Sequence, residues 1–183
     1  IITVSNFEKN NIINNLGIPE EKRAMIYNGY TEWFKPVQDI EFVYRKYIDA
    51  PSYFFFLGNT DPKKNTERTL IAYSRYLEKS EFKRQLLLAD LDKEYLDDII
   101  ERNKIDNIRE KVVMPGYIAN KDLPSIYNNA FAFLYTSLRE SFGIPLLESM
   151  ACGTPVITSN TSSMPEVAGP DAIFVNPEDP NES

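Results

Sequence analysis

Short, uniformly apolar runs recur along this chain, and stretches whose apolar residues have helical spacing separate them. Apolar runs of this length are typical of strands buried on both faces, as in a parallel sheet that helices cover on both sides. The pattern therefore predicts an α/β fold with a doubly wound parallel sheet. The candidate strands are Ala24–Tyr27, Tyr53–Leu57, Gln85–Ala89, Lys111–Met114, Phe131–Tyr135, Val156–Thr158 and Ala172–Val175.

Helical periodicity places helices between these runs, over Thr66–Lys79, Asp92–Lys104 and Lys121–Asn129, with Asn65 positioned as an N-cap. We expect the strands to form one parallel sheet. In such sheets ligands bind outside the carboxyl ends of the strands. Gly58, which follows a predicted strand, is therefore expected at the same sheet edge as Tyr117 and Glu140.

The first 23 residues have a pattern of their own. Ile1–Val4 could form a strand, and a capping box at Ser5 opens a helix that Gly17 ends. We predict that residues 1–23 are the end of an N-terminal domain with a linker helix, and that residues 24–183 form a C-terminal domain. The stretch Thr31–Ala50 is linker-like, without a clear period. A strand-like start without Met and a last segment without a regular pattern suggest truncation at both ends.

Composition excludes several kinds of site. The chain has no His, which removes imidazole chemistry, and its single Cys152 rules out a disulfide framework or a zinc cluster, so we expect no metal or cofactor. A net charge of −7 argues against broad nucleic-acid binding. No apolar run approaches the ~20 residues that cross a bilayer. We expect a cytoplasmic location, with at most peripheral association with the inner face of a membrane.

The most informative stretch is Thr136–Glu148, which follows the predicted strand Phe131–Tyr135. Pro145 suits the first helical position, and a helix over Leu146–Ala151 should follow it. The free amides at such a helix start, together with the helix dipole, favour a phosphate group. Gly143 would let a ligand approach the backbone closely.

Two carboxylates flank this anion site. Glu140 precedes the helix and Glu148 lies about one turn inside it. A carboxylate accepts hydrogen bonds from two hydroxyls, so the pair suits a ribose and a hexose on either side of a diphosphate. The plainer interpretation is that both are surface residues that stabilise a helix N-terminus. We favour a nucleotide diphosphate sugar as the ligand.

These residues carry a resemblance to a known family. The Glu-x7-Glu motif from Glu140 to Glu148 runs on into a Ser-Met-Ala-Cys-Gly-Thr-Pro stretch and a later Pro-Glu-Val-Ala-Gly. This region resembles the C-terminal, Rossmann-like domain of the GT-B-fold retaining glycosyltransferases of family 4, also called glycosyltransferases group 1. Further similar segments are Met114–Ile118, Leu57–Asn65 and Thr3–Phe7, so that nearly the whole chain is covered.

The resemblance implies roles for particular residues. Glu148 would hold the ribose and Glu140 the donor sugar. Lys64 would neutralise the diphosphate as the glycosidic bond breaks. The expected catalytic residues are Glu140 and Lys64. The expected donor-binding residues are Glu148, the amides of Phe142, Gly143 and Ile144, the loop residues Gly58, Asn59 and Lys63, and the backbone of Ile118 beside the base.

The sequence departs from the family pattern at Asn59, where an Arg is frequent. Half of the cationic clamp on the diphosphate is therefore missing or supplied by Lys63 or Arg139. Lys64 itself could be an ordinary solvated lysine, but a cation before a helix start opposes the dipole, which favours a functional role. We interpret Glu166 as a cap or brace of the donor loop, and Cys152 as a small buried residue.

The predicted activity is transfer of a hexose from a nucleotide diphosphate sugar to an acceptor hydroxyl, with retention, in bacterial polysaccharide or glycoconjugate synthesis. The acceptor, a glycan or lipid-linked sugar, would bind to the missing N-terminal domain, so the isolated fragment should be inactive. Two alternatives stay open: a GT-B-like nucleotide-sugar epimerase or phosphorylase, and a non-enzymatic doubly wound interaction domain.

Overall fold

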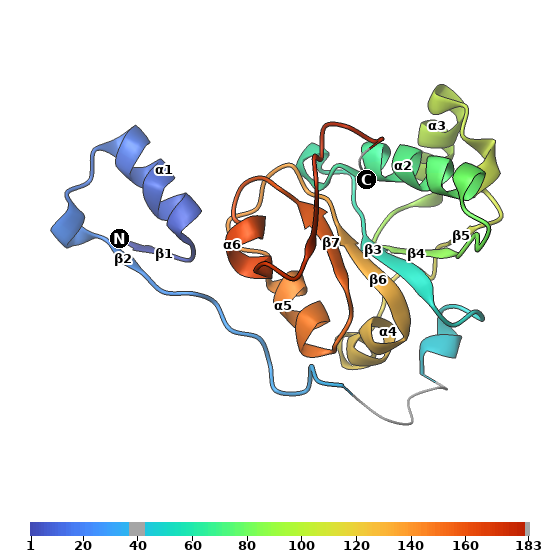
Figure 1. Cartoon of the computed structure of the whole chain (residues 1–183), viewed down its shortest axis with the longest axis horizontal. Helices are drawn as coiled ribbons and strands as arrows, with labels where there is room; N and C mark the ends of the chain where they lie inside the picture. Colours follow the sequence, from blue (N-terminus) through green and yellow to red (C-terminus); the bar gives the residue numbers. More distant parts are fainter. Residues whose placement is uncertain (37–42, 182–183) are drawn as a thin grey trace.

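A computed structural model describes residues 1–36 and 43–181 of the chain (Figure 1). Its main body is a parallel sheet in the strand order β5-β4-β3-β6-β7-β8, six strands within the described residues. The predicted α/β doubly wound sheet is thus confirmed. The strand bounds are β3 Tyr53–Leu57, β4 Leu86–Ala89, β5 Val112–Val113, β6 Ala130–Tyr135, β7 Val156–Ser159 and β8 Ile173–Val175.

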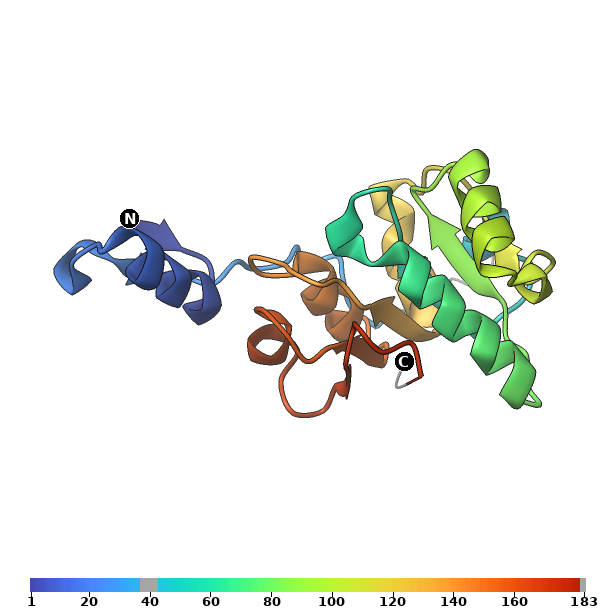
Figure 2. The ribbon, with the colours of Figure 1, turned by 90° about the horizontal axis from the view of Figure 1, so that it is seen from above.

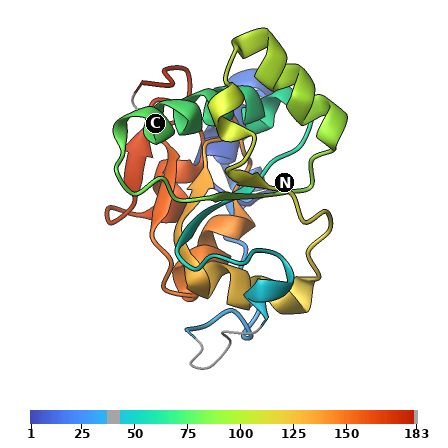
Figure 3. The ribbon, with the colours of Figure 1, turned by 90° about the vertical axis from the view of Figure 1, so that its right-hand side faces the viewer.

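Helices cover both faces of the sheet because its strands are apolar on both sides (Figure 3). In β3, Phe54 and Phe56 pack with α2 (Thr66–Lys79) and α3 (Lys93–Asn103). Tyr53 and Phe55 point to the other face. That face packs against α4 (Leu123–Asn129), α5 (Ile144–Ala151) and α6 (Met164–Ala168). Alternating residues of a strand therefore contribute to two separate apolar cores.

The first segment forms a small unit at one end of the molecule (Figure 2). It contains β1 (Ile2–Thr3), α1 (Asn6–Leu16), a 3-10 turn over Glu20–Lys22 and β2 (Ala24–Met25). The two strands pair with each other in parallel. The expectation that Ala24–Tyr27 belongs to the main sheet is therefore wrong.

The physical reason is that β1 already satisfies the backbone of this run. The Ala24 amide donates to the Ile1 carbonyl and the Ile26 amide to the Thr3 carbonyl, both at 2.9 Å. Sheet membership thus groups Ala24–Met25 with the first unit.

One helix start and one helix cap differ from the sequence expectation. α5 begins at Ile144, so Pro145 occupies the second helical position. Asn65 does precede α2, but its side chain does not cap that helix; it donates instead to the carbonyls of Thr136 (3.1 Å) and Pro177 (2.7 Å). The Asn65 side-chain amide therefore links the β3–α2 loop to the end of β6 and to the last segment, and does not cap α2.

The linker-like stretch Thr31–Ala50 contributes to the core on both sides of residues 37–42, which lie outside the described residues. Phe34, Tyr44 and Ile48 are each at most 5% exposed and pack into the core that contains α4. A short 3-10 helix spans Tyr44–Lys46. Across the described residues, no helix is both long and apolar enough to span a membrane.

Gly58 directly follows β3 in a tightly packed position. A Cβ at this glycine would lie 2.7 Å from Leu88 Cδ1 and 3.1 Å from Phe56 Cε1. We expect Gly58→Ala to lower the free energy of unfolding by about 1–3 kcal/mol, the usual cost of overpacking. Gly29→Ala is the matched control, because a Cβ at Gly29 meets nothing within 4 Å. Equal urea midpoints for the two variants would contradict this reading of the packing.

Candidate functional site

The residues expected at one sheet edge do follow the carboxyl ends of parallel strands. Gly58 follows β3, Tyr117 follows β5, and Glu140 follows β6. β3 and β6 are direct neighbours, whereas β5 is the outermost strand on the β4 side. The loop after β3 and the loop after β6 therefore meet, and the site is built where they do.

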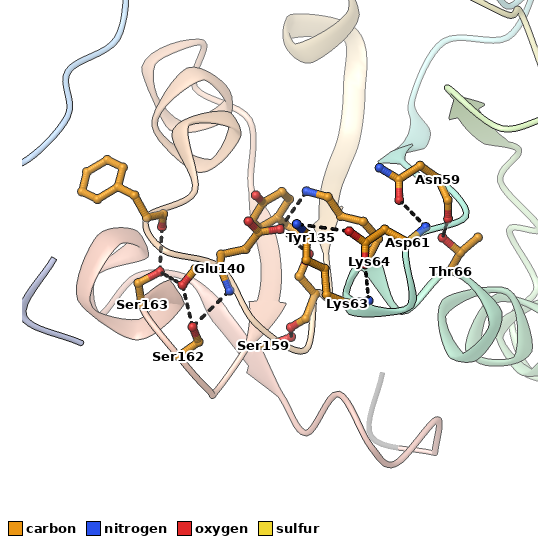
Figure 4. A network of polar contacts seen from close by, with 12 residues as sticks. Asn59, Asp61, Lys63, Lys64, Thr66, Tyr135, Glu140, Ser159, Ser162 and Ser163 are labelled. Atoms are coloured by element: carbon orange, nitrogen blue, oxygen red, sulfur yellow. Dashed lines mark hydrogen bonds and ion pairs between the residues drawn. The ribbon is translucent and has the colours of Figure 1, made fainter. Parts of the chain in front are cut away.

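An ion pair joins these two loops. Lys64 Nζ lies 2.7 Å from Glu140 Oε1, and the side chains are only 19% and 14% exposed (Figure 4). Ser137 Oγ donates to the same carboxylate oxygen at 2.9 Å. The Lys64 ammonium also lies 5.2 Å from the ring centroid of Tyr135, whose ring face attracts a cation. The two residues expected to be catalytic thus lie in direct contact, in a partly desolvated position.

The loop before Lys64 is held by its own polar groups. The Asn59 side chain accepts from the Asp61 amide at 2.9 Å, and the Asp61 carboxylate accepts from the Lys63 amide at 3.0 Å. The Lys63 carbonyl accepts from the Leu138 amide at 2.7 Å, which ties this loop to the one after β6. Asn59 is therefore a structural element of the loop that presents Lys64.

The two candidates for a second cation point elsewhere. Lys63 Nζ pairs with Asp61 at 3.1 Å, with both side chains about half exposed. The Arg139 guanidinium lies 3.5 Å from the Glu8 carboxylate and 5.9 Å from the ring centroid of Phe7. Arg139 thus faces the first unit, and Lys64 is the cation that the structure holds against Glu140.

Glu148 lies one turn inside α5 in a half-buried position. The Tyr127 hydroxyl donates to Glu148 Oε2 at 3.2 Å. Burial raises the pKa of Glu148 above its ordinary value, although the Tyr127 hydrogen bond opposes this shift. Burial and then the charges of Glu140 and Glu148 raise the pKa of Tyr135, so its hydroxyl stays protonated. The neutral phenol groups of Tyr127 and Tyr135 therefore lie beside these two carboxylates.

The start of α5 offers free amides beside these carboxylates. Across residues 1–36 and 43–181, the amides of Phe142, Gly143 and Ile144 donate no hydrogen bond. Gly143 has a φ of +103°, and a Cβ there would lie 3.1 Å from Leu146 Cδ1. This backbone turn requires glycine, and it leaves a cluster of donors at a positive helix end.

The family described as glycosyl transferases group 1 matches residues 39–183. The chain belongs to this family. Relatives of this group 1 domain include O-antigen chain mannosyltransferase B of Escherichia coli, 32% identical over 98% of this chain and 48% of the relative. The O-antigen chain mannosyltransferase RfbU of Salmonella typhimurium is 28% identical over 98% and 47%.

Solved structures give the same fold. HepE of Anabaena, in complex with UDP and glucose, superposes with a TM-score of 0.83 at 19% identity, over 99% of this chain and 50% of that one. A sucrose-phosphate synthase from Thermosynechococcus elongatus gives 0.81 at 23% identity, over 99% and 46%. The group 1 domain therefore has the fold of the C-terminal half of GT-B glycosyltransferases. It spans about half the length of the relatives it matches.

Several contacting residues were not anticipated. Ser137, Tyr127 and Tyr135 touch or neighbour the two glutamates. Tyr135 ends β6, so its place at the carboxyl edge could have been inferred. Ser137 lies inside the informative stretch Thr136–Glu148, three residues before Glu140, so its contact could also have been inferred. Tyr127 comes from α4, and no local signal indicates it. The expected role of Ile118 remains a prediction, and its side chain packs in the core.

Cys152 is buried, as expected, and burial raises the pKa of its thiol to about 11. It therefore stays protonated at neutral pH. Among the described residues, no three His, Cys, Asp or Glu side chains gather into a group that could hold a metal ion.

The raised pKa of Glu148 predicts a stability effect. Since the folded state binds this proton more tightly than the unfolded state, stability falls as pH rises from the ordinary value of 4.5 through the raised pKa. Glu148→Gln should remove this loss and raise the Tm at pH 7 by on the order of a few degrees. At a pH below 4 the gain should vanish. The exposed Glu178→Gln is the control, and an equal gain in both variants would contradict the assignment.

Proposed function

We propose that this domain binds a nucleotide diphosphate sugar, and that the full-length enzyme transfers the hexose to an acceptor hydroxyl with retention. One observation carries the proposal: the Lys64–Glu140 pair and the Glu148 carboxylate lie about a helix start with unpaired amides. The donor classes of similar proteins support it. HepE is seen with UDP and glucose, and several relatives are named mannosyltransferases of O-antigen chains. Mannose is therefore the first hexose to test.

The reaction asks the site to stabilise a leaving diphosphate. Lys64 supplies a full positive charge, and the amides of Phe142, Gly143 and Ile144 supply dipoles at a helix end. Fixed donors in a partly dry site stabilise developing charge strongly, because they need little rearrangement. These groups can neutralise the diphosphate without a metal ion. Retention is the outcome that the resemblance to family 4 implies.

Donor binding must rearrange the ion pair. Without a ligand, Glu140 neutralises Lys64. A diphosphate would offer Lys64 a second anion, and a sugar would offer Glu140 hydroxyl donors. A donor that carries both groups compensates both partners, so the pair favours the intact nucleotide sugar over either part.

The acceptor would bind to the other half of the protein. In the proposal it is a glycan or lipid-linked sugar, bound by an N-terminal domain and used in polysaccharide or glycoconjugate synthesis. The sheet edge with Lys64 and Glu140 would then form one wall of the catalytic cleft. The domain alone should bind donor and transfer little.

Lys64→Ala tests the phosphate contact. Calorimetry of the chain with GDP and UDP should show a loss on the order of 1–3 kcal/mol, the value of a charged hydrogen bond. The loss should shrink at high salt, where screening shortens the reach of the charge. Guanosine and uridine should bind almost unchanged, because they carry no phosphate.

Lys63→Ala is the matched control, since its ammonium pairs with Asp61 in a half-exposed position. If Lys63→Ala abolished diphosphate binding and Lys64→Ala did not, the clamp would lie elsewhere. If the wild-type chain bound none of the UDP-, GDP- and ADP-sugars, the proposed function itself would be rejected.

The two glutamates should separate in their effects. Glu148→Ala should weaken binding of the bare nucleoside diphosphate, because ribose contacts exist before and during reaction. Glu140→Ala should leave that affinity equal or slightly higher, since Lys64 is released from its carboxylate. In the full-length enzyme, Glu140→Ala should instead lower kcat, as contacts to the sugar matter most in the transition state. Equal loss of diphosphate affinity in both variants would show that the roles are divided wrongly.

A further inference from the structure

The carboxylate of Glu166, in α6, reaches the N-terminus of α1 in the first unit, beside which α6 lies (Figure 1). Its oxygens accept from the Asn6 amide at 2.8 and 3.0 Å and from the Phe7 amide at 3.2 Å. The Asn6 side-chain amide donates at 2.8 Å and the Tyr27 hydroxyl at 2.7 Å. One carboxylate thus collects donors from α1 and from the segment after β2.

This contact adds to a partial local cap. Ser5 Oγ accepts from the Glu8 amide at 3.2 Å, as a capping box requires. The Glu8 carboxylate, however, is turned toward Arg139 at 3.5 Å. The first two amides of α1, those of Asn6 and Phe7, are satisfied by Glu166, which lies about 160 residues further along the chain. Burial alone would raise the pKa of Glu166, but these hydrogen bonds outweigh it and lower the pKa.

Docking of α1 places Ser5 against the loop before α5. Ser5 is fully buried, and its hydroxyl donates to the Ser141 carbonyl at 2.7 Å. Two serines just before α6 hold the neighbouring carbonyls in the same way. Ser163 Oγ donates to the carbonyls of Glu140 (2.9 Å) and Phe142 (3.0 Å), and Ser162 Oγ to that of Glu140 at 2.6 Å (Figure 4).

Peptide geometry gives these contacts a consequence. In a planar trans peptide, the carbonyl of one residue points opposite to the N–H of the next. A hydroxyl that fixes the Ser141 carbonyl therefore fixes the Phe142 N–H in the opposite direction. Ser163 does the same for the Gly143 N–H through the Phe142 carbonyl. The serines thus orient the free amides that the proposed donor site uses.

We propose that Glu166 is a positioning residue: it docks α1 so that Ser5 holds the Ser141 carbonyl and turns the Phe142 amide toward an anionic ligand. The inference rests on the proposed function only for the identity of that ligand, a nucleoside diphosphate. The amide cluster is then completed by the first unit as well as by the main sheet. Because linkage is reciprocal, a ligand bound to the amides stabilises the docking of α1.

The first test needs no ligand. Backbone 15N relaxation of the chain should give rigid order parameters of ~0.85 for Ser141, Phe142 and Gly143. Glu166→Ala should lower them below ~0.6. Glu166→Gln, which keeps an acceptor oxygen for the α1 amides, should give intermediate values.

Glu67→Ala is the matched control for that test. Its carboxylate also collects several hydrogen bonds, from Arg102 and Asn103 between α2 and α3. A purely stabilising role for Glu166 would lower the Tm of both variants and leave the loop rigid in both. That result would overturn the proposal.

The second test measures GDP and UDP affinity by calorimetry. Glu166→Ala and Ser5→Ala should each weaken binding about fivefold, the effect of one misplaced hydrogen bond. Ser5→Ala keeps the Glu166 contacts, so it tests the last step even if Glu166→Ala undocks α1 entirely.

The two measurements separate the two hypotheses. If Glu166→Ala loosened the loop but the wild-type chain bound no nucleotide, the positioning role would stand and the proposed function would be rejected. Nucleotide binding that neither variant changes, with a rigid loop in both, would keep the function and reject the positioning role.

Discussion

Parallel pairing of β3 with β6 is the constraint on which the site depends. The two strands are far apart in the sequence, yet Phe54 pairs with Ala132 and Phe56 with Leu134. Their carboxyl ends therefore lie side by side at one sheet edge, and the loops that follow them come into contact. Hydrogen bonds from Leu138 to Lys63 and from Asn65 to Thr136 continue the contact beyond the sheet. The Lys64–Glu140 ion pair is a consequence of strand order.

The main sheet was readable in the sequence because its signal is local. A strand such as Tyr53–Leu57 must be apolar throughout when both faces are buried, and this property is visible without knowing its neighbours. The prediction that the run at Ala24 joins the main sheet is wrong, because its apolar pattern is too weak. Its strand has two residues, Ala24 is exposed, and Ile26 beyond it is 59% exposed. Which sheet such a strand joins is decided by the partner that reaches its backbone.

The site was predictable to the extent that position along strands determines it. Glu140 and Lys64 stand in loops after neighbouring strands, and a motif marks the helix with Glu148, so sequence alone could group them. Two hydroxyl contacts could not be found in this way: that of Tyr127 to Glu148 and that of Ser5 to the Ser141 carbonyl. Both residues reach the site only through docking of other elements. Charge partners were equally hidden. Arg139 points toward the first unit, and its neighbours in the sequence do not indicate this orientation.

The site has more hydrogen-bonding capacity than the protein's own groups use. Glu148 is half-buried with one phenolic donor, and the amides before α5 have no acceptor among the described residues. Groups left in this state cost stability, because desolvation is incompletely compensated. The aromatic core on both faces of β3 offsets that cost. A ligand that supplies both hydroxyl donors and anionic acceptors would compensate these groups together. Its binding free energy would then appear as added stability of the fold. The groups that the protein's own contacts compensate incompletely are therefore those that would make the site selective.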